Sequence, residues 1–191
     1  MQKLLTVSLR FTLVTTLLLG LGYPLLVTVI AQHLWKDKAN GQLLVKDGAI
    51  IGSRLIGQPF SGPQFFHSRP SAAGYGYDAT ASGGSNLGPT SQKLVDRIAA
   101  STKDEQQGDN DAGPVPIDLV TASASGLDPD ITPAAAAYQA RRVAQARGVA
   151  LSQVEGLIEQ HLTERQFGLL GERRVNVLQL NLALDALQPR R

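Results

Sequence analysis

The sequence contains no cysteine, and this absence removes several kinds of chemistry at once. Disulfide bonds, thiolate metal sites and cysteine nucleophiles are all excluded. The chain has only three histidines, and none of them stands in the HExxH spacing that holds zinc in metalloproteases. Aromatic residues are also scarce, at 5% of the chain. These absences argue against a thiol-dependent or zinc-dependent enzyme.

Two further motifs and one kind of charge pattern are missing. There is no Gly-Lys-Ser/Thr loop to bind phosphates and no GxSxG turn to carry a nucleophilic serine. Lys3 and Arg10 are the only charged residues before Ala31, so the remaining 16 of the 18 basic residues balance the 16 acidic ones. A neutral domain without a basic cluster argues against nucleic acid as a partner.

The most informative feature that is present is an uncharged run of twenty residues from Phe11 to Ile30. Twenty helical residues extend about 30 Å, which is the thickness of the hydrocarbon core of a bilayer. Trp35, Lys36 and Lys38 follow it and are typical of a membrane interface. We therefore predict residues 1–10 as a terminal segment, 11–35 as a transmembrane helix and 36–191 as a single domain outside the bilayer.

Two alternatives exist for this run. It could be a buried core helix, although such helices are usually amphipathic or shorter. It could also be a signal peptide cleaved after Ala31, although the run is longer than a signal peptide requires. A retained anchor is the better interpretation. The charges on its two sides are nearly balanced, so they do not decide its orientation.

The middle of the run contains Gly20, Gly22 and Pro24. Pro24 removes a backbone donor, which predicts a kink, and the glycines offer a surface without side chains where another helix can approach. The alternative is simple tolerance of Gly and Pro in membrane helices. We interpret the three residues as a helix-packing face.

The domain is predicted to be of the α+β class with a small sheet. In its first part we expect a hairpin at Leu43–Ser53 around Asp47-Gly48, an irregular but ordered segment at Gly57–Pro89, a short helix at Ser91–Ala100, a mobile loop at Ser101–Gly113, a buried strand at Pro116–Ala122 and a turn-rich segment at Ser123–Pro133.

Two helices are expected next. The first is Ala134–Arg147, between caps at Thr132 and Gly148, and the second is opened by a Ser152/Glu155 capping box and has Val154, Leu157, Ile158, His161 and Leu162 on one face. A strand at Val175–Leu180 and a helical turn at Asn181–Leu187 follow.

Two stretches of the irregular segment are candidate contact sites. The first has His67 and Arg69 beside aromatic residues, and the second is the loop of Gly83, Gly84, Ser85 and Asn86. Paired glycines expose backbone N–H groups that suit close contact with an ion, a carbonyl or a partner's backbone. A tight structural loop is an equally good interpretation of both.

Other polar residues have simpler interpretations. His161 lies on an apolar helix face, where a hydrogen-bonded core histidine is more common than a metal ligand. Asp128-Pro129-Asp130 is better explained as a turn into a helix than as a metal site. A serine hydrolase using Ser85 or Ser123 lacks a base at motif spacing. No catalytic residue and no metal ligand is therefore predicted.

Several stretches together resemble one known family, the C subunit of the bacterial Kdp-type potassium-transporting P-type ATPase. They are GYPLLVT at Gly22–Thr28, ANGQL at Ala39–Leu43, GSRLIGQPF at Gly52–Phe60, FHSRPSA at Phe66–Ala72, ASGGSNL at Ala81–Leu87, LVTASASGLDPDITPAAA at Leu119–Ala136 and VNVLQLNLALD at Val175–Asp185. The resemblance covers nearly the whole chain. The segments 101–113 and 172–174 are the parts that vary from the family pattern.

The resemblance implies a non-catalytic accessory subunit in the inner membrane, with a cytoplasmic N-terminus and a periplasmic domain. The implied partners are a potassium-selecting channel-like subunit, a P-type ATPase subunit and a small single-span subunit. The sequence agrees in lacking the phosphorylated DKTGT motif. The family is described as a catalytic chaperone that raises the ATP affinity of the pump subunit. ATP and potassium are then expected to act through the complex, and no cofactor is expected on this chain.

Overall fold

The computed structural model describes residues 1–108 and 113–187 of the chain. It divides into two compact units, Met1–Leu43 and Leu44–Arg191. The N-terminal unit is helical, and the second unit holds both small sheets and the remaining helices. This confirms the predicted α+β class.

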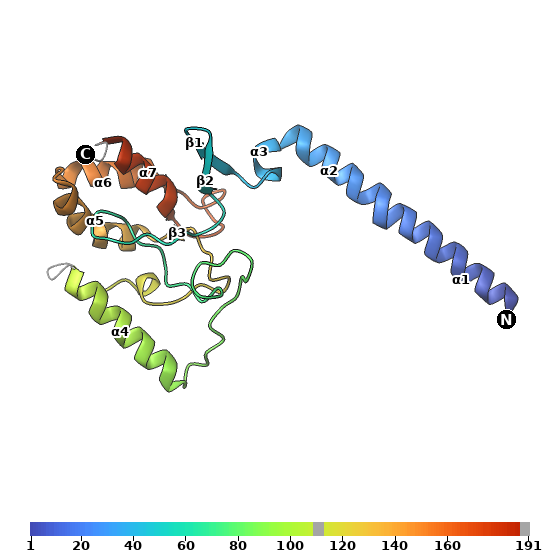
Figure 1. Cartoon of the computed structure of the whole chain (residues 1–191), viewed down its shortest axis with the longest axis horizontal. Helices are drawn as coiled ribbons and strands as arrows, with labels where there is room; N and C mark the ends of the chain where they lie inside the picture. The colour runs from blue at the N-terminus through green and yellow to red at the C-terminus, as the bar shows by residue number, and fades with distance from the viewer. Residues whose placement is uncertain (109–112, 188–191) are drawn as a thin grey trace. The chain divides into compact units, whose positions relative to one another are not determined.

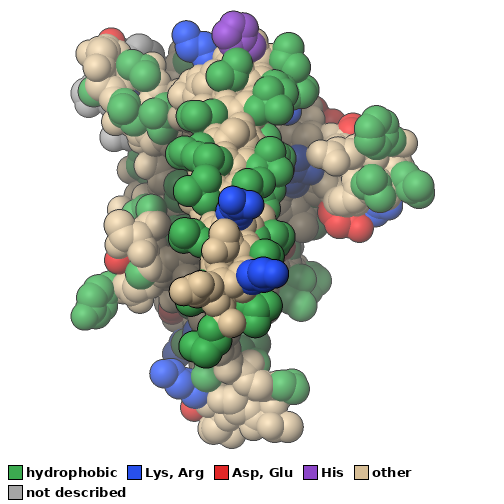
Figure 2. All heavy atoms as spheres, turned by 90° about the vertical axis from the view of Figure 1, so that its right-hand side faces the viewer, with side chains coloured by type: hydrophobic (Ala, Val, Ile, Leu, Met, Phe, Trp, Pro, Cys, Tyr) green, Lys and Arg blue, Asp and Glu red, His purple; other side chains and the backbone are tan. Residues whose placement is uncertain are grey.

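The first unit is a continuous helix from Gln2 to Leu34 that is long and apolar enough to cross a membrane. It comprises α1 (Gln2–Thr15), η1 (Thr16–Gly22) and α2 (Tyr23–Leu34), and the four-residue α3 (Lys36–Ala39) follows it. Figure 2 shows many hydrophobic side chains on the visible side of the long helix, with Lys or Arg side chains among them. The chain itself buries none of the most apolar window of this helix. The helix thus extends beyond both ends of the uncharged run.

Pro24 is accommodated by a change of helix type. The segment η1 is π-helical, and the Tyr23 N–H donates to the carbonyl of Leu18, five residues earlier. A proline ring crowds the carbonyl four residues before it, and a wider turn relieves that crowding. The predicted helix-packing face, Gly20, Gly22 and Pro24, therefore lies at a local irregularity of the long apolar helix.

Within the described residues, the second unit contains two separate sheets and four α-helices, and Figure 1 shows these elements from teal to red along the chain. Its elements in order are β1 (Leu43–Lys46, which begins at the boundary), β2 (Ala49–Ser53), α4 (Gln92–Gly108), η2 (Ile117–Leu119), β3 (Asp130–Ile131), α5 (Pro133–Arg147), α6 (Leu151–Gln160), β4 (Leu162–Thr163), β5 (Arg174–Asn176) and α7 (Val177–Leu187). The predicted hairpin is confirmed as β1–β2, with Asp47 and Gly48 at φ values of 52° and 78°.

The second sheet has the strand order β3-β5-β4, and both of its pairings are antiparallel. The central strand places Val175 opposite Ile131 on one side and opposite Leu162 on the other. Val175 is fully buried, and α5, α6 and α7 contribute most of the hydrophobic core around it. The core therefore lies between a three-stranded sheet and these helices.

The helix predicted at Ala134–Arg147 is confirmed as α5. Thr132 caps it by accepting a hydrogen bond from the Ala135 N–H, and Pro133 opens it. Gly148 ends it in the left-handed conformation, at φ 64°.

The second predicted helix is confirmed as α6, but its cap was assigned wrongly. The helix begins at Leu151 after Ala150, and the Gln153 side chain accepts a hydrogen bond from the Ala150 N–H. Ser152 and Glu155 form no capping box. The buried Val154 and Ile158 confirm the first part of the predicted apolar face. The helix ends at Gln160, however, so the prediction was wrong for His161, which caps it, and for Leu162, which belongs to β4.

The strand predicted at Val175–Leu180 was mostly wrong. Strand β5 ends at Asn176 and α7 begins at Val177. The Asn176 side chain accepts a hydrogen bond from the Gln179 N–H, so it acts as an N-cap that stops the strand. The alternation of apolar and polar residues that predicted a strand over Val175–Leu180 was therefore too short to be a reliable signal.

The strand predicted at Pro116–Ala122 is absent, and a 3₁₀ turn takes its place. Asp118 is buried there, and its carboxylate accepts hydrogen bonds from the N–H and the hydroxyl group of Thr132. Ile117, which a buried strand would cover, is 74% exposed. A polar side chain that bonds across the fold thus replaces strand pairing.

The mobile loop predicted at Ser101–Gly113 was also wrong over most of its length. Helix α4 continues without a break to Gly108, while residues 109–112 lie outside the described residues. Lys, Glu and Gln in this stretch are good helix formers, and Glu105 is only partly exposed. A polar composition was mistaken for irregular structure.

The irregular segment predicted at Gly57–Pro89 is ordered and enters the core. Two buried side-chain amides hold it there. Asn181 of α7 accepts from the Phe66 N–H and donates to the Phe66 carbonyl, both at 2.9 Å. Gln139 of α5 accepts from the His67 N–H at 2.7 Å and donates to the His67 carbonyl at 3.2 Å. The amides therefore replace a neighbouring strand.

Arginines of α5 hold the residues just before this point. Arg142 donates to the carbonyls of Pro63 and Phe65 at 2.9 and 3.1 Å. Arg147 donates to the Gln64 carbonyl and lies over the Phe65 ring, 5.3 Å from its centre. Side chains of α5 and α7 thus satisfy a backbone that forms no regular structure of its own.

Replacing Asn181 with leucine should strongly destabilise the domain. The variant leaves both polar groups of the buried Phe66 backbone without a partner, which costs about 3 kcal/mol of unfolding free energy. Chemical denaturation of the full chain in detergent, followed by circular dichroism, measures the loss. The matched control is Gln160→Leu at the exposed end of α6, which should change the free energy by less than about 0.5 kcal/mol. Equal stabilities of the two variants would contradict the role of Asn181.

Candidate functional site

His67 is fixed against α5. Its backbone pairs with Gln139, and its ring Nε2–H donates to the Gly62 carbonyl at 3.0 Å. Burial lowers the pKa of His67 below its usual 6.5, and the charge of Arg142 lowers it further, while the bond to Gly62 raises it. The folded domain therefore favours a neutral imidazole.

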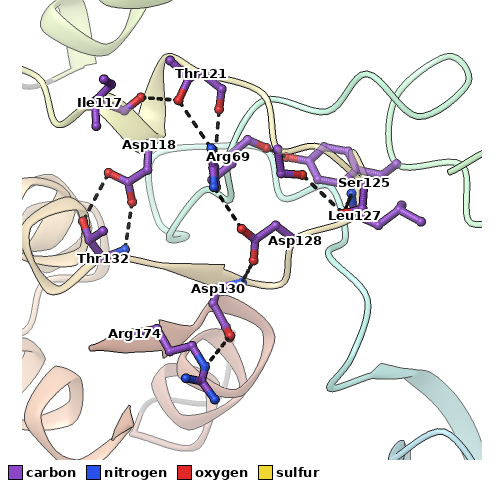
Figure 3. A network of polar contacts seen from close by, with 12 residues as sticks. Arg69, Ile117, Asp118, Thr121, Ser125, Leu127, Asp128, Asp130, Thr132 and Arg174 are labelled. Atoms are coloured by element: carbon purple, nitrogen blue, oxygen red, sulfur yellow. Dashed lines mark hydrogen bonds and ion pairs between the residues drawn. The ribbon is translucent and has the colours of Figure 1, made fainter. Parts of the chain in front are cut away.

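Arg69 lies on a different side of the segment, against residues 121–128 (Figure 3). Its guanidinium forms an ion pair with Asp128 at 3.1 Å and donates to the Thr121 carbonyl at 3.4 Å. The ion pair is about a quarter exposed on the arginine side, so solvent screens it. The structure thus does not bring His67 and Arg69 together as one cluster.

The glycine loop packs on the same 121–128 segment. The Gly83 N–H donates to the Ser125 carbonyl at 2.9 Å, and the Ser82 hydroxyl group donates to the same oxygen at 3.0 Å. A Cβ at Gly84 would lie 3.0 Å from the Ala124 carbonyl oxygen, so the backbones are in close contact. Arg69, Gly83 and Gly84 are therefore brought to one segment, while Asn86 is exposed with a φ of 51°.

Asp128 lies before β3 and Asp130 is its first residue, so the turn that the sequence indicated ends before Asp130. Asp128 pairs with Arg69 and accepts a hydrogen bond from the Asp130 N–H, and Asp130 pairs with Arg174 of β5 at 2.9 Å (Figure 3). Burial raises the pKa of Asp130, while hydrogen bonding to Asn176 and the charge of Arg174 oppose that rise. Within the described residues, no group of three or more His, Asp or Glu could hold a metal ion.

The serines considered as nucleophiles have no base in the described part of the chain. Ser123 is buried, and its hydroxyl group lies 3.5 Å from that of Ser125. The rings of His67 and His161 instead contact the carbonyls of Gly62 and Leu157. Ser85 is partly exposed, and no hydrogen bond among the described residues joins it to a histidine or a carboxylate. The geometry gives no support to a serine hydrolase.

Sequence reasoning missed the side chains that brace the site. Gln139, Arg142 and Asn181 are 0%, 9% and 2% exposed, and each binds backbone of the irregular segment. Polar residues inside helices carry no motif that reveals their partners. The only available signal was the presence of an amide and an arginine on helix faces that are otherwise apolar.

The lowered pKa of His67 predicts a pH-dependent stability. Below the unfolded value of 6.5 the unfolded chain binds a proton that the folded chain resists, so the free energy of unfolding falls as the pH falls. His67→Gln should reduce this fall between about pH 7.5 and about pH 5.5. Denaturation of the wild-type chain and the variant at both pH values measures the difference. Identical pH profiles would show that His67 does not contribute.

Substitution of two glycines tests whether residues 83 and 126 are glycine because neighbouring atoms are too close for a side chain. Gly126 has a φ of +68°, and a Cβ there would lie 2.6 Å from the Ala73 nitrogen and 2.7 Å from the Gly83 oxygen. Gly126→Ala should therefore lower the unfolding free energy by about 2 kcal/mol. Gly83→Ala is the control, because nothing lies within 4 Å of its Cβ position. Denaturation should show Gly83→Ala close to wild type; a tolerated Gly126→Ala would refute the close contact.

Comparison with known proteins covers nearly the whole chain. The family model described as "KdpC: K+-transporting ATPase, c chain" matches residues 5–186. A potassium-transporting ATPase KdpC subunit of Koribacter versatilis is 58% identical over 99% of this chain and 97% of its own length. The KdpC subunit of Acidobacterium capsulatum is 57% identical over 96% and 98%, and that of Mycobacterium bovis is 51% identical over 98% and 100%. The chain therefore belongs to the KdpC family, the c chain of the K⁺-transporting ATPase.

Proposed function

We propose that the chain is a non-catalytic accessory subunit of a high-affinity, ATP-driven potassium uptake complex. The observation that carries this proposal is the family match over residues 5–186. The sequence contains no phosphate-binding loop, and the described residues hold no metal-binding cluster. A chain without these groups contributes to transport by binding other subunits.

In this proposal the helix Gln2–Leu34 anchors the chain in the inner membrane. Its length and apolar composition support a single crossing. The N-terminus lies in the cytoplasm, and residues 36–191 lie in the periplasm. Gly20, Gly22 and Pro24 provide the surface for a neighbouring membrane helix. The π-helical turn beside Pro24 supports this role, because such turns occur frequently at functional sites.

The partners in this proposal are the channel-like potassium-selecting subunit, the P-type ATPase subunit and the small single-span subunit. The periplasmic domain covers the potassium entrance of the channel-like subunit. Arg69 and the loop of Gly83, Gly84, Ser85 and Asn86 belong to the contact region, and His67 braces it from within. The attachment of Arg69, Gly83 and Gly84 to residues 121–128 supports a preformed surface.

A periplasmic domain cannot touch cytoplasmic ATP. Any effect of the chain on the ATP affinity of the pump subunit is therefore indirect, and its coupling free energy is transmitted through the membrane subunits. Thermodynamic linkage then requires the reciprocal effect, so ATP binding on the pump strengthens attachment of this chain by the same factor.

The proposal is tested by removing the domain while keeping the anchor. The full-length chain is replaced by residues 1–38 in cells that produce the other subunits. These cells should take up no potassium from dilute medium, because the proposed contacts of the domain are lost. The full-length chain is the control, and detection of the anchor in purified membranes confirms that the fragment is inserted. Uptake that persists with residues 1–38 alone would contradict a required role for the domain.

A further inference from the structure

The connection between β4 and β5, residues 164–173, presents large hydrophobic side chains to solvent. We refer to it as the 164–173 tip. Phe167, Leu169 and Leu170 are 96%, 77% and 55% exposed. An aromatic and two leucines gathered within four residues differ from the isolated exposed apolar side chains that any surface carries. The tip is therefore a candidate contact surface.

The backbone of the tip is held in one conformation. Gln166 and Leu170 pair through reciprocal backbone hydrogen bonds of 2.8 and 2.9 Å. Phe167 has a φ of 55°, a left-handed conformation that a bulky residue rarely adopts. Strain of this kind persists where the surrounding structure imposes it, and it is concentrated at functional positions.

Two ion pairs close the tip below the hydrophobic residues. Arg165 pairs with Glu172, and Arg173 pairs with Glu164 at 3.0 Å. The strand that follows is the central strand of the β3-β5-β4 sheet, where Val175 is fully buried and Arg174 pairs with Asp130. Both ion pairs are largely exposed and add little stability, so the backbone hydrogen bonds between Gln166 and Leu170 and the central strand are what hold the hydrophobic side chains in place.

The charges identify the kind of partner. The two arginines and two glutamates of the tip neutralise one another, so the tip has no excess of basic residues to attract anionic lipid. Protein interfaces, in contrast, use rigid aromatic anchors in uncharged pockets surrounded by polar residues. The two neutralising ion pairs at the ends of the tip, on either side of Phe167 in the sequence, match the polar rim of such an interface.

We propose that the 164–173 tip inserts Phe167 and Leu169 into an uncharged apolar pocket on the extramembrane surface of another subunit of the potassium transport complex. This contact rests on the proposed function, which supplies the partner subunits, and it adds an anchor separate from the glycine loop. Because the tip is already rigid, little conformational entropy is lost when it binds.

Photo-crosslinking identifies what covers the tip. The photoreactive residue p-benzoylphenylalanine replaces Phe167 in the full chain, which is produced in cells together with the other subunits. The expected product is a covalent adduct with one of those subunits, mapped by mass spectrometry to apolar residues outside its membrane spans. An adduct with lipid, an adduct with a second copy of this chain, or no adduct would each overturn the proposal.

Substitution measures the strength of the contact. Phe167→Ser should weaken association of the full chain with the detergent-solubilised complex by about tenfold or more, without changing its melting temperature. Tyr75→Ser is the matched control, because Tyr75 is also a fully exposed aromatic residue of the domain, and it should change association less than about twofold. Unchanged association of Phe167→Ser, or an equal loss in Tyr75→Ser, would overturn the role of the tip.

The same measurement separates the two proposals. A wild-type chain that binds no subunit of the complex would overturn the proposed function together with this inference. If the wild-type chain assembles and Phe167→Ser assembles equally well, only the role of the tip is overturned.

Discussion

The domain depends on hydrogen bonding between helix side chains and a backbone that has no regular structure. Asn181 and Gln139 each accept an N–H and donate to a carbonyl, at Phe66 and at His67 respectively. Both amides are almost completely buried. Burying this backbone without partners would cost more free energy than its side chains return, so the amides allow Phe66 to enter the core. The segment rich in glycine and proline is therefore an integral part of the fold.

The same bracing explains the character of the candidate site. From the fixed point at His67 the chain continues to Arg69, which binds the 121–128 segment, and later to Gly83, which binds it again. His67, Arg69 and Gly83 form their hydrogen bonds with the backbone and side chains of other parts of the domain. Such a surface is preformed but has few polar groups left for chemistry, which suits a subunit that acts by contact.

Contacts at two places would allow one chain to stabilise an assembly, as the proposed function requires. The anchor offers the glycines beside its π-helical turn, and the domain offers the 164–173 tip with Phe167 at its end. Two weak attachments on one chain reinforce each other, because the first raises the effective concentration of the second. Membership in the KdpC family gives such attachments a physiological setting.

The sequence by itself determined the long apolar helix, the β1–β2 hairpin, the caps of α5 and the family, because each depends on local spacing or on residues in a fixed order. Tertiary structure decided the rest. The capping of α7 by Asn176 and the bonds of Asp118 to Thr132 ended or replaced predicted strands, since a polar side chain with a distant partner overrides local alternation. His67 and Arg69, separated by one residue in the sequence, were directed to different partners because Gln139 lies in α5 and Asp128 lies just before β3. Long-range hydrogen bonds of this kind leave no pattern in the sequence.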